Sequence, residues 1–200
     1  MPAELQFIHG AMGSRKTAEA LMRKYNYEER GRRVLLLKPE VDIRDGRNIL
    51  RSRAGMQSEC MAIGRDFDLR TLKVLECGAS QRKYDFIMID EAQFLTPEQV
   101  DQLAEIVDEW DIPVICYGLR TDFQGKLFAG SARLLEIADE IRQIDPVCWC
   151  GRRAIMNARL SDGKIVKQGE QVVIGGDERY VSLCRKHYRE ENLGPAGQQI

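Results

Sequence analysis

The chain has 200 residues, of which 44% are hydrophobic and 30% are charged, and this length suits one ordinary domain with a smaller attachment. The composition argues against disorder, and no apolar run approaches the roughly 20 residues of a membrane span. Lys and Arg number 30 against 31 Asp and Glu, so the sequence lacks the basic excess of a general nucleic-acid binder. The first nine residues carry no secretory signal, and we expect a cytoplasmic protein that binds neither membranes nor nucleic acid.

Residues 1–145 alternate between predicted strands and predicted helices. Four short apolar runs are typical of parallel strands covered on both faces: 5–9, 34–37, 86–89 and 114–117. An amphipathic helix is predicted after the first run, with Ala18, Leu21, Met22 and Tyr25 on one face. A second helix begins with Thr96 as N-cap, Pro97 in its first turn and Gln99 completing a capping box. We therefore expect an α/β domain, a parallel sheet with helices on both faces.

The character of the sequence changes after residue 145. Apolar runs become shorter, Gly and Cys become frequent, and a hairpin is predicted to turn at 161–163. Residues 146–191 are therefore expected to form a second, mostly β unit. Residues 192–200 are rich in Gly, Pro and Gln and are expected to be a flexible tail.

A phosphate-binding loop is indicated at residues 10–17. The segment matches G-x-x-x-x-G-K-[ST] except that an arginine stands in place of the second glycine. Backbone N–H groups and a helix N-terminus would surround the phosphates, Lys16 would reach the outer phosphates, and Thr17 would bind Mg²⁺. An ordinary turn with a solvated lysine is the alternative. The residues assigned to ATP in this loop are Gly10, Ala11, Met12, Gly13, Ser14, Arg15, Lys16 and Thr17.

Two acids follow the predicted strand at 86–89. A buried strand that ends in an aspartate is how the Mg²⁺-associated acid of such sites is placed, and this describes Asp90. The adjacent Glu91 could act as a base toward an attacking oxygen. A pair of solvated loop acids is the alternative, but the phosphate loop upstream favours a nucleotide site.

Four candidate zinc ligands occur as two pairs, Cys148 with Cys150 and Cys184 with His187. Three thiolates and an imidazole suit tetrahedral Zn²⁺, and four protein ligands leave no open position, so the site would be structural. Chance clustering of small hydrophobic residues is the alternative. The remaining cysteines, Cys60, Cys77 and Cys116, are expected to be buried thiols.

The segment 170–180 lies between the two pairs of candidate ligands. It is apolar and then glycine-paired, and it is too long for a tight turn. A loop anchored by a metal could close over a small ligand. The segment could also be the edge of a plain hairpin. The local sequence alone favours this hairpin.

These motifs, together with 38–44, 90–94 and 118–124, closely resemble the type II, zinc-containing family of thymidine kinases of bacteria and the eukaryotic cytosol. The resemblance covers about residues 4–190 and is most distinctive from Val173 to His187. It implies a P-loop α/β domain and a small zinc-anchored β domain whose long loop, the lasso, covers the nucleoside. The implied reaction is phosphorylation of the 5′-hydroxyl of thymidine by ATP and Mg²⁺, in nucleotide salvage for DNA synthesis. A homotetramer and feedback inhibition by thymidine triphosphate are also implied.

The resemblance assigns roles to individual residues. Glu91 would be the general base, and Lys16, Thr17 and Asp90 would serve ATP and Mg²⁺, with Gln93 and Phe94 beside them. Met12, Leu119, Phe123, Phe128 and Tyr180 would line the thymine pocket. Backbone groups from Val173 to Gly175 would pair with the base, and Asp42 and Arg44 would lie near the sugar. The residues assigned to the substrate are Met12, Asp42, Arg44, Phe94, Leu119, Phe123, Phe128, Val173, Ile174, Gly175 and Tyr180.

For part of the thymine pocket, an ordinary structural role stays an alternative. Leu119, Phe123 and Phe128 would be ordinary core residues of any α/β domain. Met12 could fill a gap in the packing.

Arg15 is where the sequence departs from the family pattern. A side chain at this glycine position should clash with the bound phosphate or hold the loop in a nonproductive shape, while the gain from its exposed charge is about 1 kcal/mol or less. We therefore expect normal thymidine binding, weak ATP binding and low turnover. Three functions stay open: an active thymidine kinase, a nucleoside-binding relative with impaired phosphoryl transfer, and a P-loop ATPase with a nucleic-acid-docking zinc ribbon. The net charge of −1 and the segment 170–180 count against the third.

Overall fold

The structure is a computed structural model that describes residues 2–43, 45–72, 83–171 and 179–195. Arg44, Val173, Ile174 and Gly175, which are expected at the substrate, lie outside the described residues, and so does Cys77. Among the helices that the structure describes, none combines the length and the apolar character needed to cross a membrane.

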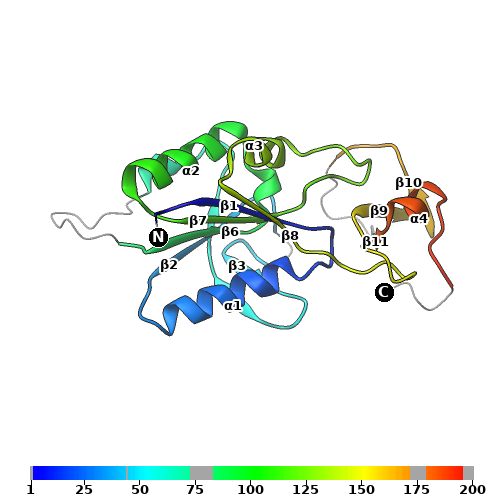
Figure 1. Cartoon of the computed structure of the whole chain (residues 1–200), viewed down its shortest axis with the longest axis horizontal. Helices are drawn as coiled ribbons and strands as arrows, with labels where there is room; N and C mark the ends of the chain where they lie inside the picture. The colour runs from blue at the N-terminus through cyan, green and yellow to red at the C-terminus, as the bar shows by residue number, and fades with distance from the viewer. Residues whose placement is uncertain (1, 44, 73–82, 172–178, 196–200) are drawn as a thin grey trace.

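A six-stranded parallel sheet forms the centre of the larger unit, with the strand order β5-β2-β6-β7-β1-β8 (Figure 1). Its strands are β1 (Leu5–His9), β2 (Val34–Pro39), β5 (Met61–Ile63), β6 (Phe86–Ile89), β7 (Val114–Gly118) and β8 (Glu140–Gln143). The helix α1 covers one face of the sheet, and α2 and α3 cover the other (Figure 1). The predicted parallel sheet with helices on both faces is confirmed. The two outer strands were not predicted, because β5 is very short and β8 is largely polar.

The helices are α1 (Lys16–Glu28), α2 (Pro97–Trp110) and α3 (Ala129–Ile137), with short 3-10 turns η1 (Leu69–Thr71) and η2 (Ala92–Phe94). The predicted capping box of α2 is confirmed: the Gln99 N–H donates to Thr96 Oγ1 over 3.1 Å, and the Thr96 N–H donates to Gln99 Oε1 over 3.2 Å. Both orphan donors at the start of α2 are therefore satisfied. Val100 and Leu103 of this helix are fully buried in the core beside the sheet.

The predicted face of α1 is confirmed for Leu21 and wrong for Met22 and Tyr25. Met22 and Tyr25 are 57% and 61% exposed, whereas Ala20 and Leu21 are buried. The helix is rotated because Tyr27 stacks on Phe86 with the ring centroids 4.0 Å apart, which turns that side of α1 toward the sheet. A contact between distant segments has decided which of two neighbouring apolar stripes is buried.

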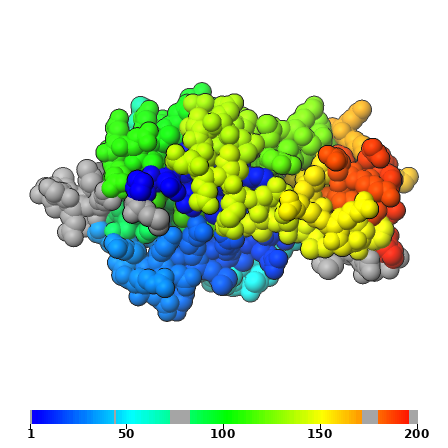
Figure 2. Space-filling model, in the orientation of Figure 1, coloured from blue at the N-terminus to red at the C-terminus, as the bar shows by residue number. Residues whose placement is uncertain are grey.

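A smaller unit lies at the carboxyl-terminal end, at the right of Figures 1 and 2. It contains an antiparallel sheet of order β10-β9-β11 and a short helix. These elements are β9 (Met156–Ser161), β10 (Lys164–Val166), β11 (Arg179–Leu183) and α4 (Arg185–Arg189). The predicted hairpin turn is confirmed, with Asp162 and Gly163 in left-handed conformations between β9 and β10. The domain boundary at residue 146 stays a prediction.

A third, two-stranded sheet consists of the hairpin strands β3 (Ile49–Arg51) and β4 (Gln57–Glu59). It follows β2 in the chain and packs beside α1, because Leu50 belongs to the same buried cluster as Ala20 and Leu21. The carboxyl ends of β1, β2, β6 and β7, the α1 N-terminus and the smaller unit therefore surround the candidate site.

Candidate functional site

The predicted chemical residues meet at one edge of the sheet. The phosphate loop follows β1, Asp90 follows β6, and Leu119 follows β7, and these strands are parallel neighbours. Their carboxyl ends therefore lie together, which is where open parallel sheets bind ligands.

The phosphate loop is closely packed around its first glycine. A Cβ on Gly10 would lie 2.3 Å from the Ile144 carbonyl oxygen and 2.5 Å from Ser14 Oγ, so no larger residue fits there. Lys16 Nζ donates to the Gly10 and Ala11 carbonyl oxygens, each over 3.1 Å. The predicted loop residues thus form one compact turn at the N-terminus of α1.

Arg15 takes a backbone conformation that favours glycine. Its φ of 64° and ψ of 20° are left-handed, and it is the N-cap of α1 without a side-chain capping hydrogen bond. Its side chain is exposed. Left-handed backbone at a residue with a Cβ costs of order 1 to 3 kcal/mol. The structure therefore shows backbone strain at Arg15, and the predicted weak binding of ATP stays a prediction.

The half-buried Thr17 and the buried Asp90 place two side-chain oxygens together. Thr17 Oγ1 donates to Asp90 Oδ2 over 2.7 Å, and Asp90 Oδ1 is buried with no hydrogen-bond partner. Burial raises the pKa of Asp90 to about 7, and the charge of Glu91 adds to this, while the Thr17 hydrogen bond and Lys16 oppose it. Carboxylate and hydroxyl oxygens suit Mg²⁺, and an orphaned carboxylate oxygen fits such a cation.

Glu91 is held in a strained position beside Asp90. Its φ of 53° is left-handed, and it is the N-cap of η2. Gln93 Nε2 donates to Glu91 Oε2, and Gln93 Oε1 accepts from the Leu119 N–H over 2.9 Å. Because Gln93 is itself buried and fixed by β7, it orients the carboxylate. Strain of this kind at a candidate base is a feature of functional sites.

Several of the predicted pocket residues are brought together near this edge. Phe94 meets Phe128 edge to face, with ring centroids 5.8 Å apart. Phe123 is buried under the Arg159 guanidinium, which lies 3.6 Å from its ring centroid. Leu119 and Tyr180 are half-buried. Burial alone does not separate a thymine pocket from ordinary core, so this assignment stays a prediction.

Asp42 lies buried beyond the end of β2. Lys38, which has no exposed surface, places its Nζ 3.8 Å from Asp42 Oδ2. The same Nζ donates to the Gly46 and Ile49 carbonyl oxygens, each over 2.8 Å. Lys38 therefore fixes both the loop that carries Asp42 and the start of β3.

The smaller unit holds the phosphate loop through residues that the sequence analysis missed. Asn157 Oδ1 accepts from the Met12 N–H over 2.8 Å, and Asn157 Nδ2 donates to the Thr121 carbonyl oxygen over 2.8 Å. Ser182 Oγ donates to the Met12 carbonyl oxygen. No local pattern predicts these contacts, which join residues more than a hundred positions apart.

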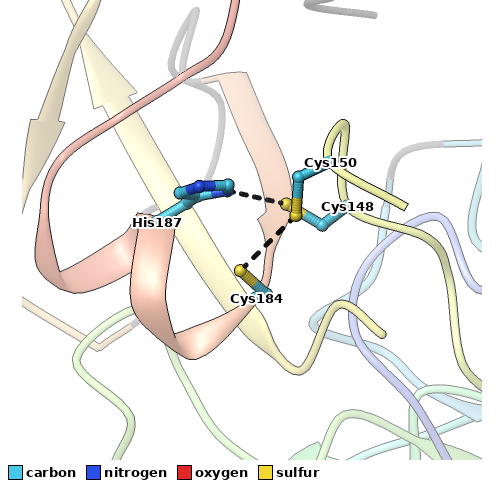
Figure 3. A group of neighbouring side chains, drawn as sticks. All are labelled: Cys148, Cys150, Cys184 and His187. Carbon is cyan, nitrogen blue, oxygen red and sulfur yellow. Dashed lines mark hydrogen bonds between the residues drawn. The ribbon is translucent and has the colours of Figure 1, made fainter. Parts of the chain in front are cut away.

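The four predicted zinc ligands converge in the smaller unit (Figure 3). Their ligand atoms all lie within 4.8 Å of one another. Cys148 and Cys150 come from a turn closed by the Cys148 N–H and the Arg152 carbonyl oxygen, and Cys184 and His187 come from the start of α4. Trp149 stacks on His187 with centroids 4.3 Å apart and covers the imidazole. This donor set fits tetrahedral Zn²⁺.

The stability of the fold should depend on pH through His9, the last residue of β1. Burial lowers its pKa to about 4, and the charges of Arg120 and Lys16 add to this against the opposing Asp145. Because the unfolded imidazole has a pKa of about 6.5, the unfolded chain takes up this proton first. His9 therefore contributes stability that is present above pH 6.5 and is lost as the pH falls toward 4, about 2 kcal/mol between pH 7 and pH 5.

Urea unfolding at both pH values should show this loss in the parent and a loss smaller by about 2 kcal/mol in His9→Gln. The difference between the two proteins isolates His9 from other titrating groups. Equal losses in parent and variant would contradict the prediction.

Comparison with known proteins bears directly on this site. The sequence model of the thymidine kinase family matches residues 3–188. The thymidine kinase of Enterobacteria phage T4 is 49% identical over 189 residues, which cover 94% of this chain and 96% of that protein. The thymidine kinase of Legionella pneumophila (strain Paris) is 46% identical over 193 residues, covering 96% and 92% of the two chains. That of Salmonella typhi is 44% identical over 189 residues, covering 94% and 91%.

Proposed function

The chain belongs to the thymidine kinase family, and from this premise we propose that it transfers the γ-phosphoryl group of ATP to the 5′-hydroxyl of thymidine. The observation that carries the proposal is the placement of Glu91 next to the hydrogen-bonded pair of Thr17 and Asp90 beside the phosphate loop. A base, a cation site and a phosphate cradle are the parts that phosphoryl transfer to an alcohol requires. Neither alternative function is favoured by the comparisons.

In the proposed mechanism, the loop N–H groups and Lys16 hold the phosphates. Thr17 and Asp90 would hold Mg²⁺, which would neutralise charge on the outer phosphates. Glu91 accepts the 5′-hydroxyl proton as that oxygen attacks the γ-phosphorus. The new bond is between the 5′-oxygen and phosphorus, and the bond to the β-phosphate oxygen breaks. Its electron pair leaves with ADP, and the Gln93 hydrogen bond keeps Glu91 aimed at the hydroxyl throughout.

The substrate side of the site is assigned to residues around the thymine ring and the sugar. Met12, Phe94, Leu119, Phe123, Phe128 and Tyr180 would enclose the thymine ring, and Asp42 would lie near the sugar. The flat aromatic surfaces suit a planar base, and the edge-to-face contact of Phe94 with the buried Phe128 would make one wall rigid. Zn²⁺ at the Cys and His cluster would hold the smaller unit against Met12. A cytoplasmic homotetramer inhibited by thymidine triphosphate completes the proposal.

The product identifies the reaction. With [γ-³²P]ATP, Mg²⁺ and thymidine, we expect label in thymidine 5′-monophosphate, which is distinguished from the 3′-isomer by chromatography against both standards. Label in the 3′-monophosphate, or in inorganic phosphate alone, would contradict the proposal.

Arg15→Gly is expected to improve both ATP affinity and turnover at least tenfold, a factor worth about 1.4 kcal/mol. The substitution removes the Cβ and side chain from the phosphate cradle and relieves the left-handed strain at this position. Thymidine affinity should stay the same, because Arg15 is not among the residues assigned to the thymine pocket. The measurement is ATP titration by calorimetry, with steady-state kinetics in both substrates.

The exposed Arg30, at the end of α1, offers a matched control that removes a guanidinium far along the helix from the loop. Arg30→Gly should leave ATP affinity unchanged. If Arg15→Gly binds ATP no better than the parent, Arg15 is an accommodated phosphate contact, and the reading of the chain as a binding-only relative must be dropped.

A further inference from the structure

The hairpin of β3 and β4 brings an arginine to the phosphate loop. The turn between the strands carries Arg53, and a Cβ built on Gly13 would lie 3.6 Å from Arg53 Nη1. The guanidinium therefore lies beside the middle of the loop, close enough that a side chain at this position would touch it. Arg53 is remote from the loop in the sequence and belongs to none of its motifs.

Two contacts hold the hairpin that carries Arg53 in place. Leu50 is buried with Ala20 and Leu21 of α1, so β3 is docked on the helix that begins at the loop. The buried Lys38 donates to the carbonyl oxygen of Ile49, the first residue of β3.

The turn itself is closed by hydrogen bonds. The Ser52 N–H donates to the Met56 carbonyl oxygen over 2.8 Å, and the Met56 N–H donates to Ser52 Oγ over 3.2 Å. The Gly55 N–H donates to the Ser52 carbonyl oxygen over 3.0 Å. The position of Arg53 is therefore built into the fold and does not depend on a free loop.

The Arg53 side chain has no acidic partner among the described residues. Its side chain is exposed, and among the residues that the structure describes no ion pair includes it. The neighbouring Arg51 differs, because its guanidinium donates to Gln57 Oε1 over 2.9 Å. Near Gly13 the loop adds Arg15, Lys16 and the positive end of α1. Cations gathered at one turn repel one another, and an anionic ligand would offset that repulsion.

We propose that Arg53 is a further substrate-binding residue, which contacts the phosphate chain of the donor nucleotide from the hairpin side of the loop. This inference rests on the proposed function only in taking ATP as the donor. A guanidinium can bind two phosphate oxygens at once, and it can follow charge that develops during transfer. Lys16 would then approach the phosphates from inside the loop and Arg53 from outside it.

The test compares Arg53→Gln and Arg53→Lys with Arg51→Gln, which removes an exposed guanidinium from the same hairpin. Calorimetry measures MgATP affinity without any acceptor, at low and at high salt, and kinetics give KM for ATP, KM for thymidine and kcat. We expect Arg53→Gln to weaken ATP binding at least tenfold and to reduce its salt dependence, with Arg53→Lys between it and the parent. Thymidine KM and all values for Arg51→Gln should stay within about twofold of the parent.

The inference is overturned if Arg53→Gln binds ATP within about twofold of the parent, if Arg51→Gln loses as much, or if thymidine KM rises equally. These outcomes leave the proposed function intact. A parent that binds ATP but does not phosphorylate thymidine would sink the proposed function and leave the Arg53 result standing.

Discussion

Glu91→Gln is expected to lower kcat by about 10² to 10⁴ while leaving the affinities for ATP and thymidine within about twofold. The only proposed role of the Glu91 carboxylate is to accept a proton in the transition state. Glutamine has nearly the same shape, and its amide can rotate to present an oxygen to the Gln93 side-chain amide. The ground state therefore loses little, and the loss falls on the chemical step.

Single-turnover kinetics at saturating substrates measure this step directly, and calorimetry measures the two affinities. Glu98→Gln is a matched control, because Glu98 is exposed in the first turn of α2 and carries the same charge. That variant should keep the parent rate. If Glu91→Gln keeps more than about a tenth of the rate, Glu91 is not the base.

Zinc removal is the second change with a large expected effect. The smaller unit has a core of its own, but that core is small and is built around Cys148, Cys184 and Leu183. Structural zinc contributes directly to folding free energy, so loss of the ion should loosen β9, β11 and α4. The contacts that Asn157 and Ser182 make to Met12 would be lost with them. Thymidine binding should fail before the larger unit unfolds.

Trp149 provides the readout, because its stacking on His187 reports the state of the cluster. A Trp110→Phe background removes the other tryptophan of the chain. Adding a chelator should change Trp149 emission and abolish thymidine binding while the circular dichroism of the larger unit persists. Urea melts of the chelated protein should then show two transitions in place of one.

Comparing Cys184→Ser with Cys60→Ser tests whether zinc binding depends on the cluster or on any thiol of the chain. Cys60 is a half-buried thiol outside the cluster, so Cys60→Ser should keep its zinc, whereas Cys184→Ser should lose it. Metal analysis of the freshly purified proteins gives the zinc content. A parent without zinc, whose Cys148 and Cys184 react with thiol reagents, would contradict the structural role.

Features encoded in adjacent residues were predictable from the sequence. The apolar strands, the capping box at Thr96 and Gln99, the phosphate loop and the paired Cys and His residues each depend on short spacings. The position of Asp90 beside Thr17 followed from a general property of parallel sheets, whose strand ends meet at one edge. The main elements of the fold and the donor side of the site could therefore be placed without coordinates.

The remaining features depend on which distant segments touch. The burial of Met22 and Tyr25 on α1 was predicted wrongly, because the stacking of Tyr27 on Phe86 cannot be derived from helical periodicity. Asn157 looks like an ordinary strand residue until β9 is placed against the phosphate loop. Arg53 looks like one more exposed cation until the docking of Leu50 brings the hairpin to Gly13. Each of these contacts is a property of the packed chain and not of its local sequence.

The dependence of ADP formation on thymidine tests the central claim most directly. Purified protein with ATP and Mg²⁺ is followed by a coupled ADP assay, first alone and then with thymidine, while labelled thymidine monophosphate is counted in parallel. We predict almost no ADP without thymidine, and one thymidine 5′-monophosphate for each ADP when thymidine is present. An equal rate of ADP formation with and without thymidine, and no labelled nucleotide, would show that water is the acceptor, and the chain would not be a thymidine kinase in function.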